Sequence, residues 1–181
     1  MDKQNEVKET EFFVIKLKVS VPDKDKPVTI EIFVEAVNYA DAERLSVKLS
    51  EYYGIEQLID CKIDKVKKNE ISLFEKIKVD DIDSLKVLSF VDNDFETEKP
   101  QHGFYTAKYY YTNVDGKTVK DQITFANYGN GFVTQQLSKF VNKYIQTETV
   151  ITSLVKEKYN VMVVSEDVMN ASVSLHESIN S

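Results

Sequence analysis

The chain has 181 residues, of which 42% are hydrophobic and 29% charged, and its formal net charge is −7. This composition is typical of folded globular proteins and argues against a disordered chain. Because no stretch approaches the roughly 20 apolar residues of a membrane span, and residues 1–10 lack the apolar core of a secretory signal, we expect a cytoplasmic protein without a membrane segment.

The first predicted elements are two antiparallel strands that form a hairpin. In residues 11–19 every second position is apolar, and Lys16 and Lys18 lie between the apolar ones, which is the period of a half-buried strand. A polar loop at 22–27 leads to a second strand at 28–37, which is rich in β-branched residues.

A helix and a third strand complete this first segment. Asn38 or Asp41 is suited to cap a helix whose apolar residues recur at helical spacing, and Gly54 is suited to end it. Residues 58–66 predict a third strand, and residues 71–74 predict an optional fourth one.

An acidic segment at 78–103 follows this first ββαβ(β) repeat, which we assign to residues 1–77. The segment carries seven acidic residues, yet it also holds an apolar cluster at 85–91 that a pure linker would lack. We expect a short strand or helix packed against one repeat, followed by a looser stretch through Pro100.

The second repeat is assigned to residues 104–164 and follows the same order of elements. Strands predicted at 104–114 and 118–128 flank an Asp-Gly pair, which is a strong signal for a tight turn. Apolar residues at helical spacing follow at 132–144. The remaining strands are predicted at 150–155 and 161–164.

The two segments can be aligned strand for strand. Phe13 matches Tyr105 and Lys16 matches Lys108, with the buried positions in the same phase. The sequence therefore predicts an α+β protein of two tandem ββαβ(β) repeats, each an antiparallel sheet packed by one helix.

The C-terminal segment, 165–181, contains three acidic residues and no lysine or arginine. It fits a short amphipathic helix capped by Ser165, with Glu166 and Asp167 at the positive end of the helix. The alternative is a flexible acidic tail that binds a partner protein or a second copy of the chain.

Residue types that support catalysis are scarce. The single cysteine, Cys61, alternates with isoleucines and predicts a buried thiol rather than a reactive one. The only histidines, His102 and His176, cannot complete a zinc site of about four ligands, no nucleotide-binding loop is present, and residues 92–96 lack the glycine and glutamate of a calcium loop. We expect no enzyme activity, no metal and no cofactor.

Aromatic and basic residues gather in the second repeat. Eleven of the 20 Phe and Tyr residues lie between 104 and 159, and residues 99–164 carry 8 lysines against 4 acidic residues. The alternation along 104–114 turns Lys108 and Tyr110 outward. An exposed aromatic ring beside lysines on a sheet is typical of single-stranded nucleic-acid binding, because bases stack on the ring and phosphates meet the cations.

We assign eight residues to a candidate nucleic-acid surface, which carries one aromatic ring and seven lysines: Lys16, Lys18, Lys108, Tyr110, Lys117, Lys120, Lys139 and Lys143. The alternative is that the tyrosines only fill and rim the sheet, since tyrosine is a good strand former. Arg44 is the only arginine, which argues against sequence-specific reading of base edges.

Two parts of the chain resemble an uncharacterised domain family of unknown function found in Bacteroidetes and their phages, including crAss-like phages. The likeness rests on the strand end and helix start at 34–44, on 104–111 with the turn at 115–117, and on 147–155. It implies a phage or mobile-element context and supplies no catalytic residues.

These patterns predict a non-enzymatic binding protein that binds single-stranded DNA or RNA without sequence preference, and the resemblance implies that it is of phage type and acts in the cytoplasm of the host cell. The alternative is a protein-interaction or virion-assembly component, whose exposed sheet edges or 165–181 tail would bind a protein or a second copy of the chain.

Overall fold

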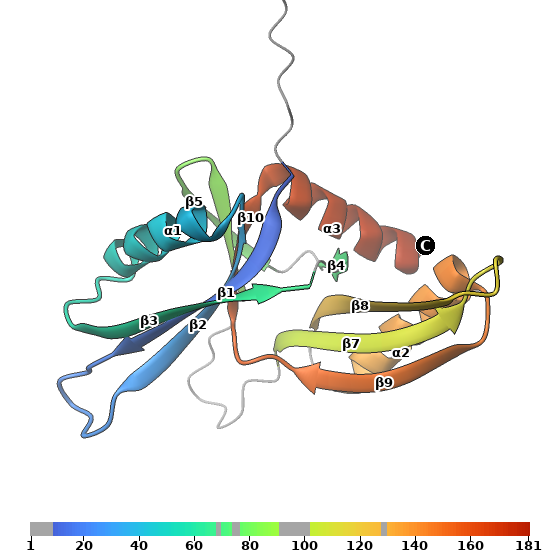
Figure 1. The fold of residues 1–181 in the computed structure, drawn as a ribbon, viewed down its shortest axis with the longest axis horizontal. Coiled ribbons are helices and arrows are strands. Elements are labelled where there is room, and N and C mark those ends of the chain that lie inside the picture. The colour runs from blue at the N-terminus through green and yellow to red at the C-terminus, as the bar shows by residue number, and fades with distance from the viewer. Residues whose placement is uncertain (1–8, 68–69, 74–76, 91–101, 128–129) are drawn as a thin grey trace, which may run out of the picture. The chain divides into compact units, whose positions relative to one another are not determined.

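A computed structural model describes residues 9–67, 70–73, 77–90, 102–127 and 130–181. In this described part the chain forms ten strands, three α-helices and one π-helical turn, and most of the regular structure is sheet (Figure 1). The predicted α+β class is confirmed. The chain divides into two compact units, Met1–Lys68 and Asn69–Ser181.

Unit 1 is a three-stranded antiparallel sheet with one helix. Its elements in chain order are β1 (Glu11–Val19), β2 (Val28–Ala36), α1 (Tyr39–Tyr52) and β3 (Leu58–Val66). β1 lies between β2 and β3. Phe13, Ile15, Leu17 and Val19 of β1 are buried, and Phe13 meets the Tyr39 ring of α1 edge-on at a centroid distance of 4.9 Å. The alternation predicted for this strand therefore decides which face α1 covers.

The start of α1 is fixed by two reciprocal hydrogen bonds. Asn38 Oδ1 accepts from the Asp41 N–H at 2.9 Å, and the Asp41 carboxylate accepts from the Val37 N–H at 3.0 Å. Burial opposes ionisation of Asp41, but the bonds from Arg44 and from the Val37 N–H outweigh it, so the pKa of this carboxyl is lowered. Gly54, at φ +64°, follows the helix in the left-handed conformation that glycine favours.

Unit 2 contains two sheets. Its elements in chain order are β4 (Glu70–Ser72), β5 (Ile77–Ile82), β6 (Leu85–Phe90), β7 (Gly103–Thr112), β8 (Thr118–Asn127), α2 (Asn130–Phe140), the π-helical turn η1 (Val141–Ile145), β9 (Thr149–Lys156), β10 (Val161–Ser165) and α3 (Glu166–Ile179). One sheet has the order β4-β8-β7-β9, and β7 is antiparallel to both β8 and β9. β6 pairs antiparallel with both β10 and β5.

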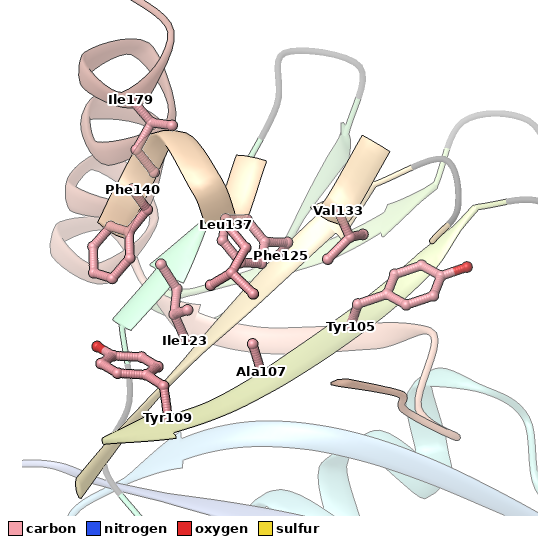
Figure 2. Close-up of a cluster of buried hydrophobic side chains, with 9 residues drawn as sticks. All are labelled: Tyr105, Ala107, Tyr109, Ile123, Phe125, Val133, Leu137, Phe140 and Ile179. Carbon is pink, nitrogen blue, oxygen red and sulfur yellow. The ribbon is translucent and has the colours of Figure 1, made fainter. Parts of the chain in front are cut away.

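The core of unit 2 lies between α2 and one face of the β7 and β8 strands (Figure 2). Alternate residues of β7 point into it, and α2 supplies the opposite side. Its members are Tyr105, Ala107, Tyr109, Ile123, Phe125, Val133, Leu137, Phe140 and Ile179. The same alternation that buries Tyr105 and Tyr109 turns the residues between them to the other face of the sheet.

The tail is a helix, as one of the two sequence alternatives expected. Ser165 caps α3 by accepting a hydrogen bond from the Val168 N–H at 3.3 Å. Ser172 and Ile179 are buried, and the Leu73 N–H just after β4 donates to the Ser172 carbonyl at 3.1 Å. Figure 2 shows Ile179 reaching the core cluster from α3. α3 is therefore packed against unit 2 by its apolar stripe.

Two optional strands belong to different sheets than predicted. Residues 71–74 were expected to extend the first repeat, but β4 is parallel to β8 in unit 2. Residues 161–164 were expected in the sheet of the second repeat, but β10 pairs with β6. The strand expected within 78–103 is the β5–β6 hairpin, while residues 91–101 lie outside the described part. Strand pairing depends on partners distant in sequence, which a local pattern does not specify.

The core predicts the response to truncation at Leu137, which is 5% exposed. Leu137→Ala should lower the free energy of unfolding of unit 2 by about 3 kcal/mol, because it removes buried methyl groups and leaves a cavity. Ser138→Ala, one position along on the exposed side of α2, should change it by less than about 0.5 kcal/mol. Urea denaturation followed by circular dichroism measures both, and similar values for the two variants would contradict this packing.

Candidate nucleic-acid interface

Three of the predicted site residues lie together on the sheet face opposite α2. Lys108 and Tyr110 are exposed on β7, two positions apart. Lys120 of β8 is directly across the strand pair from Tyr110, and Gln122 is across from Lys108. Residues at such positions point to the same face with Cβ atoms about 5 Å apart. We call Lys108, Tyr110 and Lys120 the Lys/Tyr face.

Lys108 and Tyr110 point away from α2 because Tyr109, the residue between them, is buried on the α2 side of the sheet. Tyr109, 4% exposed, lies in the core and stacks near Tyr111 with a centroid distance of 6.3 Å. Burial, and then the nearby carboxylates of Asp121 and Glu70, raise the pKa of Tyr109, so this phenol stays neutral. Tyr110 is 37% exposed and is available for contact.

The other half of this sheet face is closed by protein. Phe104 and Thr106 of β7 are buried, as is Thr124 across from Thr106, with 2.9 Å between the two threonine Oγ1 atoms. The Tyr159 hydroxyl hydrogen-bonds to both threonines, and burial raises the pKa of this phenol. The Phe104 and Tyr159 rings lie 5.6 Å apart. A ligand on this face would therefore meet only the end that carries the Lys/Tyr face.

Lys117 extends the Lys/Tyr face beyond the strand ends. It is exposed in the β7–β8 turn, next to the terminal pair Thr112 and Thr118. Asn113 Oδ1 accepts from the Lys117 N–H at 3.0 Å, and Gly116 adopts φ +75°, so the turn is ordered by its own bonds.

Lys139 and Lys143 do not belong to this surface. They lie on α2 and η1, on the opposite side of the sheet, beside the end of α3. Lys139 Nζ donates to Asn180 Oδ1 at 3.2 Å, and Lys143 Nζ donates to Ser181 Oγ at 2.8 Å and to the Ser178 carbonyl. A shallow hollow of about 420 Å³ opens here, lined by Lys139, Asn142, Lys143, Ile179, Asn180 and Ser181.

Lys16 and Lys18 lie in unit 1 on the face of β1 away from α1. Lys16 Nζ is 3.0 Å from Asp64 and 3.7 Å from Glu31, and the hydrogen bond to Asp64 is the main cause of its raised pKa. Its charge is thus balanced within the unit. Lys18 is exposed, across from Thr29 and Asp60.

Groups suited to catalysis stay apart in the described part of the chain. His102 stacks on Phe90 at a centroid distance of 5.9 Å, and His176 Nδ1 is 3.4 Å from Ser72 Oγ. Cys61 is half-buried rather than buried as expected, because β3 is the edge strand beside β1. Among described residues no group of three or more His, Cys, Asp and Glu side chains is arranged to hold a metal ion. The described helices are each too short or too polar to cross a bilayer.

We compared the chain with known protein families and with curated proteins. No protein-family model matches the chain, and a search of curated proteins finds no significant match.

The two faces of β7 predict different reactivity of neighbouring tyrosines. Tetranitromethane should nitrate Tyr110 at least an order of magnitude faster than Tyr109 or Tyr159, because Tyr110 is the one of these three that is exposed and the two buried phenols have raised pKa values. Peptide mass spectrometry over a time course measures the three rates. Exposed Tyr144 is the internal standard, and nitration of Tyr109 at the rate of Tyr110 would contradict the assigned strand phase.

Proposed function

We propose that the chain is a non-enzymatic binding protein that holds single-stranded DNA or RNA without sequence preference on the Lys/Tyr face. The observation that carries the proposal is the pair formed by Tyr110 and Lys120, with Lys108 two positions along β7. An exposed ring between two ammonium groups offers a stacking surface for a base and cations for the phosphates on either side.

The number of lysines on the face determines how strongly the affinity depends on salt. Lys108, Lys120 and Lys117 lie on or next to the face, so we expect only about three phosphates to be neutralised and an affinity that falls steeply with salt. Lysine is a point charge without the bidentate geometry of arginine, and Arg44 is the only arginine. The face therefore suits backbone and stacking contacts rather than base-edge recognition.

The two units support a duplication in which only the second copy kept a binding face. Each has a central strand, β1 in unit 1 and β7 in unit 2, which pairs with the strand that follows it and with the strand after the next helix. At the positions matched by sequence, Lys16 is held by Asp64 and Glu31, whereas Lys108 faces Gln122 and Ser153. In unit 1, protein carboxylates therefore occupy the place that a phosphate would take beside Lys108.

The sequence resemblance to the family from Bacteroidetes and their phages favours a phage or mobile-element context for this proposal. For this function we expect the protein in the host cytoplasm, where single-stranded intermediates of replication and transcription occur. A protein-interaction or virion-assembly component is the second candidate, and the apolar edge strand β9 is the observation that favours it.

Substitutions on the two sides of unit 2 test the nucleic-acid proposal. Tyr110→Ala should weaken binding of a thymidine oligonucleotide in low salt by about tenfold or more, because stacking of one base contributes about 1–3 kcal/mol. Lys108→Gln and Lys120→Gln should each reduce the slope of log affinity against log salt by about 0.7. Fluorescence anisotropy and electrophoretic mobility shift measure these effects.

Matched controls come from the α2 side. Tyr144, like Tyr110, is an exposed tyrosine, and Lys139 is an exposed lysine. Tyr144→Ala and Lys139→Gln should leave both affinity and salt slope unchanged. An unmodified chain that binds no oligonucleotide in low salt, or controls that lose as much affinity as Tyr110→Ala, would refute the proposed face.

A further inference from the structure

Between Thr149 and Val155, the edge strand β9 lacks the charged residues and prolines that usually protect a sheet edge. Among described residues it pairs only with β7, at the end of the order β4-β8-β7-β9 (Figure 1). Val150, Ile151 and Val155 are 41%, 42% and 53% exposed, and no charged residue lies between Thr149 and Val155. Edge strands with free backbone groups and apolar side chains readily add another strand.

The corresponding edge strand of unit 1 shows the contrast. β3 also flanks the central strand of its sheet, but it carries an acidic or basic residue at nearly every second position, namely Asp60, Lys62, Asp64 and Lys65. Such charges discourage pairing with a further strand. The opposite edge of the β9 sheet is β4, and the residue that follows it, Leu73, is hydrogen-bonded to α3. β9 is therefore the edge of this sheet that stands open to a partner.

A bulge divides β9 into two halves. Lys108 is across from Ser153 and Tyr109 is across from Ile151, so Thr152 is the extra residue, and its hydroxyl donates to the Lys108 carbonyl at 3.1 Å. An extra residue reverses the facing of the side chains beyond it. A strand of regular alternation would match only one half of β9.

Two exposed valines of β9 point to the Lys/Tyr side of the sheet, since Val150 is across from Tyr110 and Val155 from Thr106. On the α2 side, Ile151 is across from Tyr109 and Leu154 from Ala107. Consider a second copy of β9 that pairs antiparallel with the first, about a two-fold axis between Thr152 and Ser153. In this arrangement the side chains that meet across the axis point to the same face of the sheet in both halves of β9. Val150 is then paired with Val155 of the partner subunit.

The same two-fold axis pairs Ile151 with Leu154 of the partner subunit. A slip by one residue would place Val150 across from Leu154 of the partner subunit, and these side chains point to opposite faces. The pattern of β9 is therefore complementary to itself in one register, with apolar side chains meeting apolar side chains on both faces.

We propose that β9 is a homodimerisation edge, through which two chains join their four-stranded sheets into one continuous eight-stranded sheet. The contact is isologous, as expected for a closed dimer. Two edge strands alone bury less than the roughly 1,200–2,000 Å² of a stable interface, so the dimer should dissociate reversibly in the micromolar range. The inference rests on β9 alone.

The dimer would also enlarge the proposed nucleic-acid surface. Both Lys/Tyr faces would lie on the same side of the joined sheet. Lys108 and Lys108 of the partner subunit would be three strand spacings apart, or about 14 Å. A single strand that crosses the two-fold axis could contact both faces, which would give a dimer higher avidity than a monomer. This consequence depends on the proposed function, whereas dimerisation itself does not.

Sedimentation equilibrium of the full chain without nucleic acid tests the proposal. The unmodified chain should show a monomer–dimer equilibrium in the micromolar range. Val150→Lys and Val155→Glu should each shift it to monomer, because each puts a charge against an apolar partner across the axis. Val114→Lys, at a fully exposed turn position of the same unit, is the matched control and should dimerise like the unmodified chain.

Mixing the two variants tests the register. In a heterodimer of Val150→Lys with Val155→Glu, the new ammonium group pairs with the new carboxylate, and the other site keeps its two valines. The mixture should therefore regain dimer that neither variant forms alone. A monomeric unmodified chain, a dimer that persists in Val150→Lys, or no recovery on mixing would overturn the proposal. Since no oligonucleotide is present, each of these results leaves the proposed function of the Lys/Tyr face untouched.

Discussion

The packing of α2 on alternate residues of β7 is the interaction on which the candidate site depends. Tyr105, Ala107 and Tyr109 lie in the core. Because side chains alternate along a strand, the residues between them must point to the opposite face. Lys108 and Tyr110 must face the other side of the sheet, and the register with β8 brings Lys120 beside them. A shift of this strand by one residue would bury the lysine and expose the core tyrosines. The free energy of core burial thus keeps the Lys/Tyr face in position.

A similar scaffold carries a different charge pattern in each unit. Each unit has a central strand, β1 or β7, with a hairpin partner on one side and an edge strand, β3 or β9, on the other. In unit 1 the outward lysine, Lys16, is held between Asp64 and Glu31, and exposed ion pairs of this kind contribute little stability. Their main effect is to cancel the local potential. In unit 2 the equivalent lysine, Lys108, is across from Gln122 and Ser153, so neither neighbouring strand places a carboxylate directly opposite it.

Much of this architecture follows from local sequence patterns. Strand alternation, the Asn38 and Ser165 caps and the Asp-Gly turn are short-range features, and the structure has them where the sequence predicts them. The destinations of β4 and β10 could not be predicted, because strand pairing depends on segments far apart in sequence. Lys139 and Lys143 were grouped with Lys108 because charge alone does not reveal that α2 lies on the opposite side of the sheet. The ion pairs of Lys16 likewise required the register of β1 with β3.

The most direct test of the central claim is a map of where a single strand touches the protein. Backbone amide shifts of the ¹⁵N-labelled chain, recorded while a thymidine oligonucleotide is added in low salt, report each residue separately. The account predicts that the largest changes fall on Lys108, Tyr110 and Lys120 and on the turn at Lys117, while α2 and α3 stay unchanged. Changes centred on Lys139 and Lys143, or none at all at saturating oligonucleotide, would contradict it.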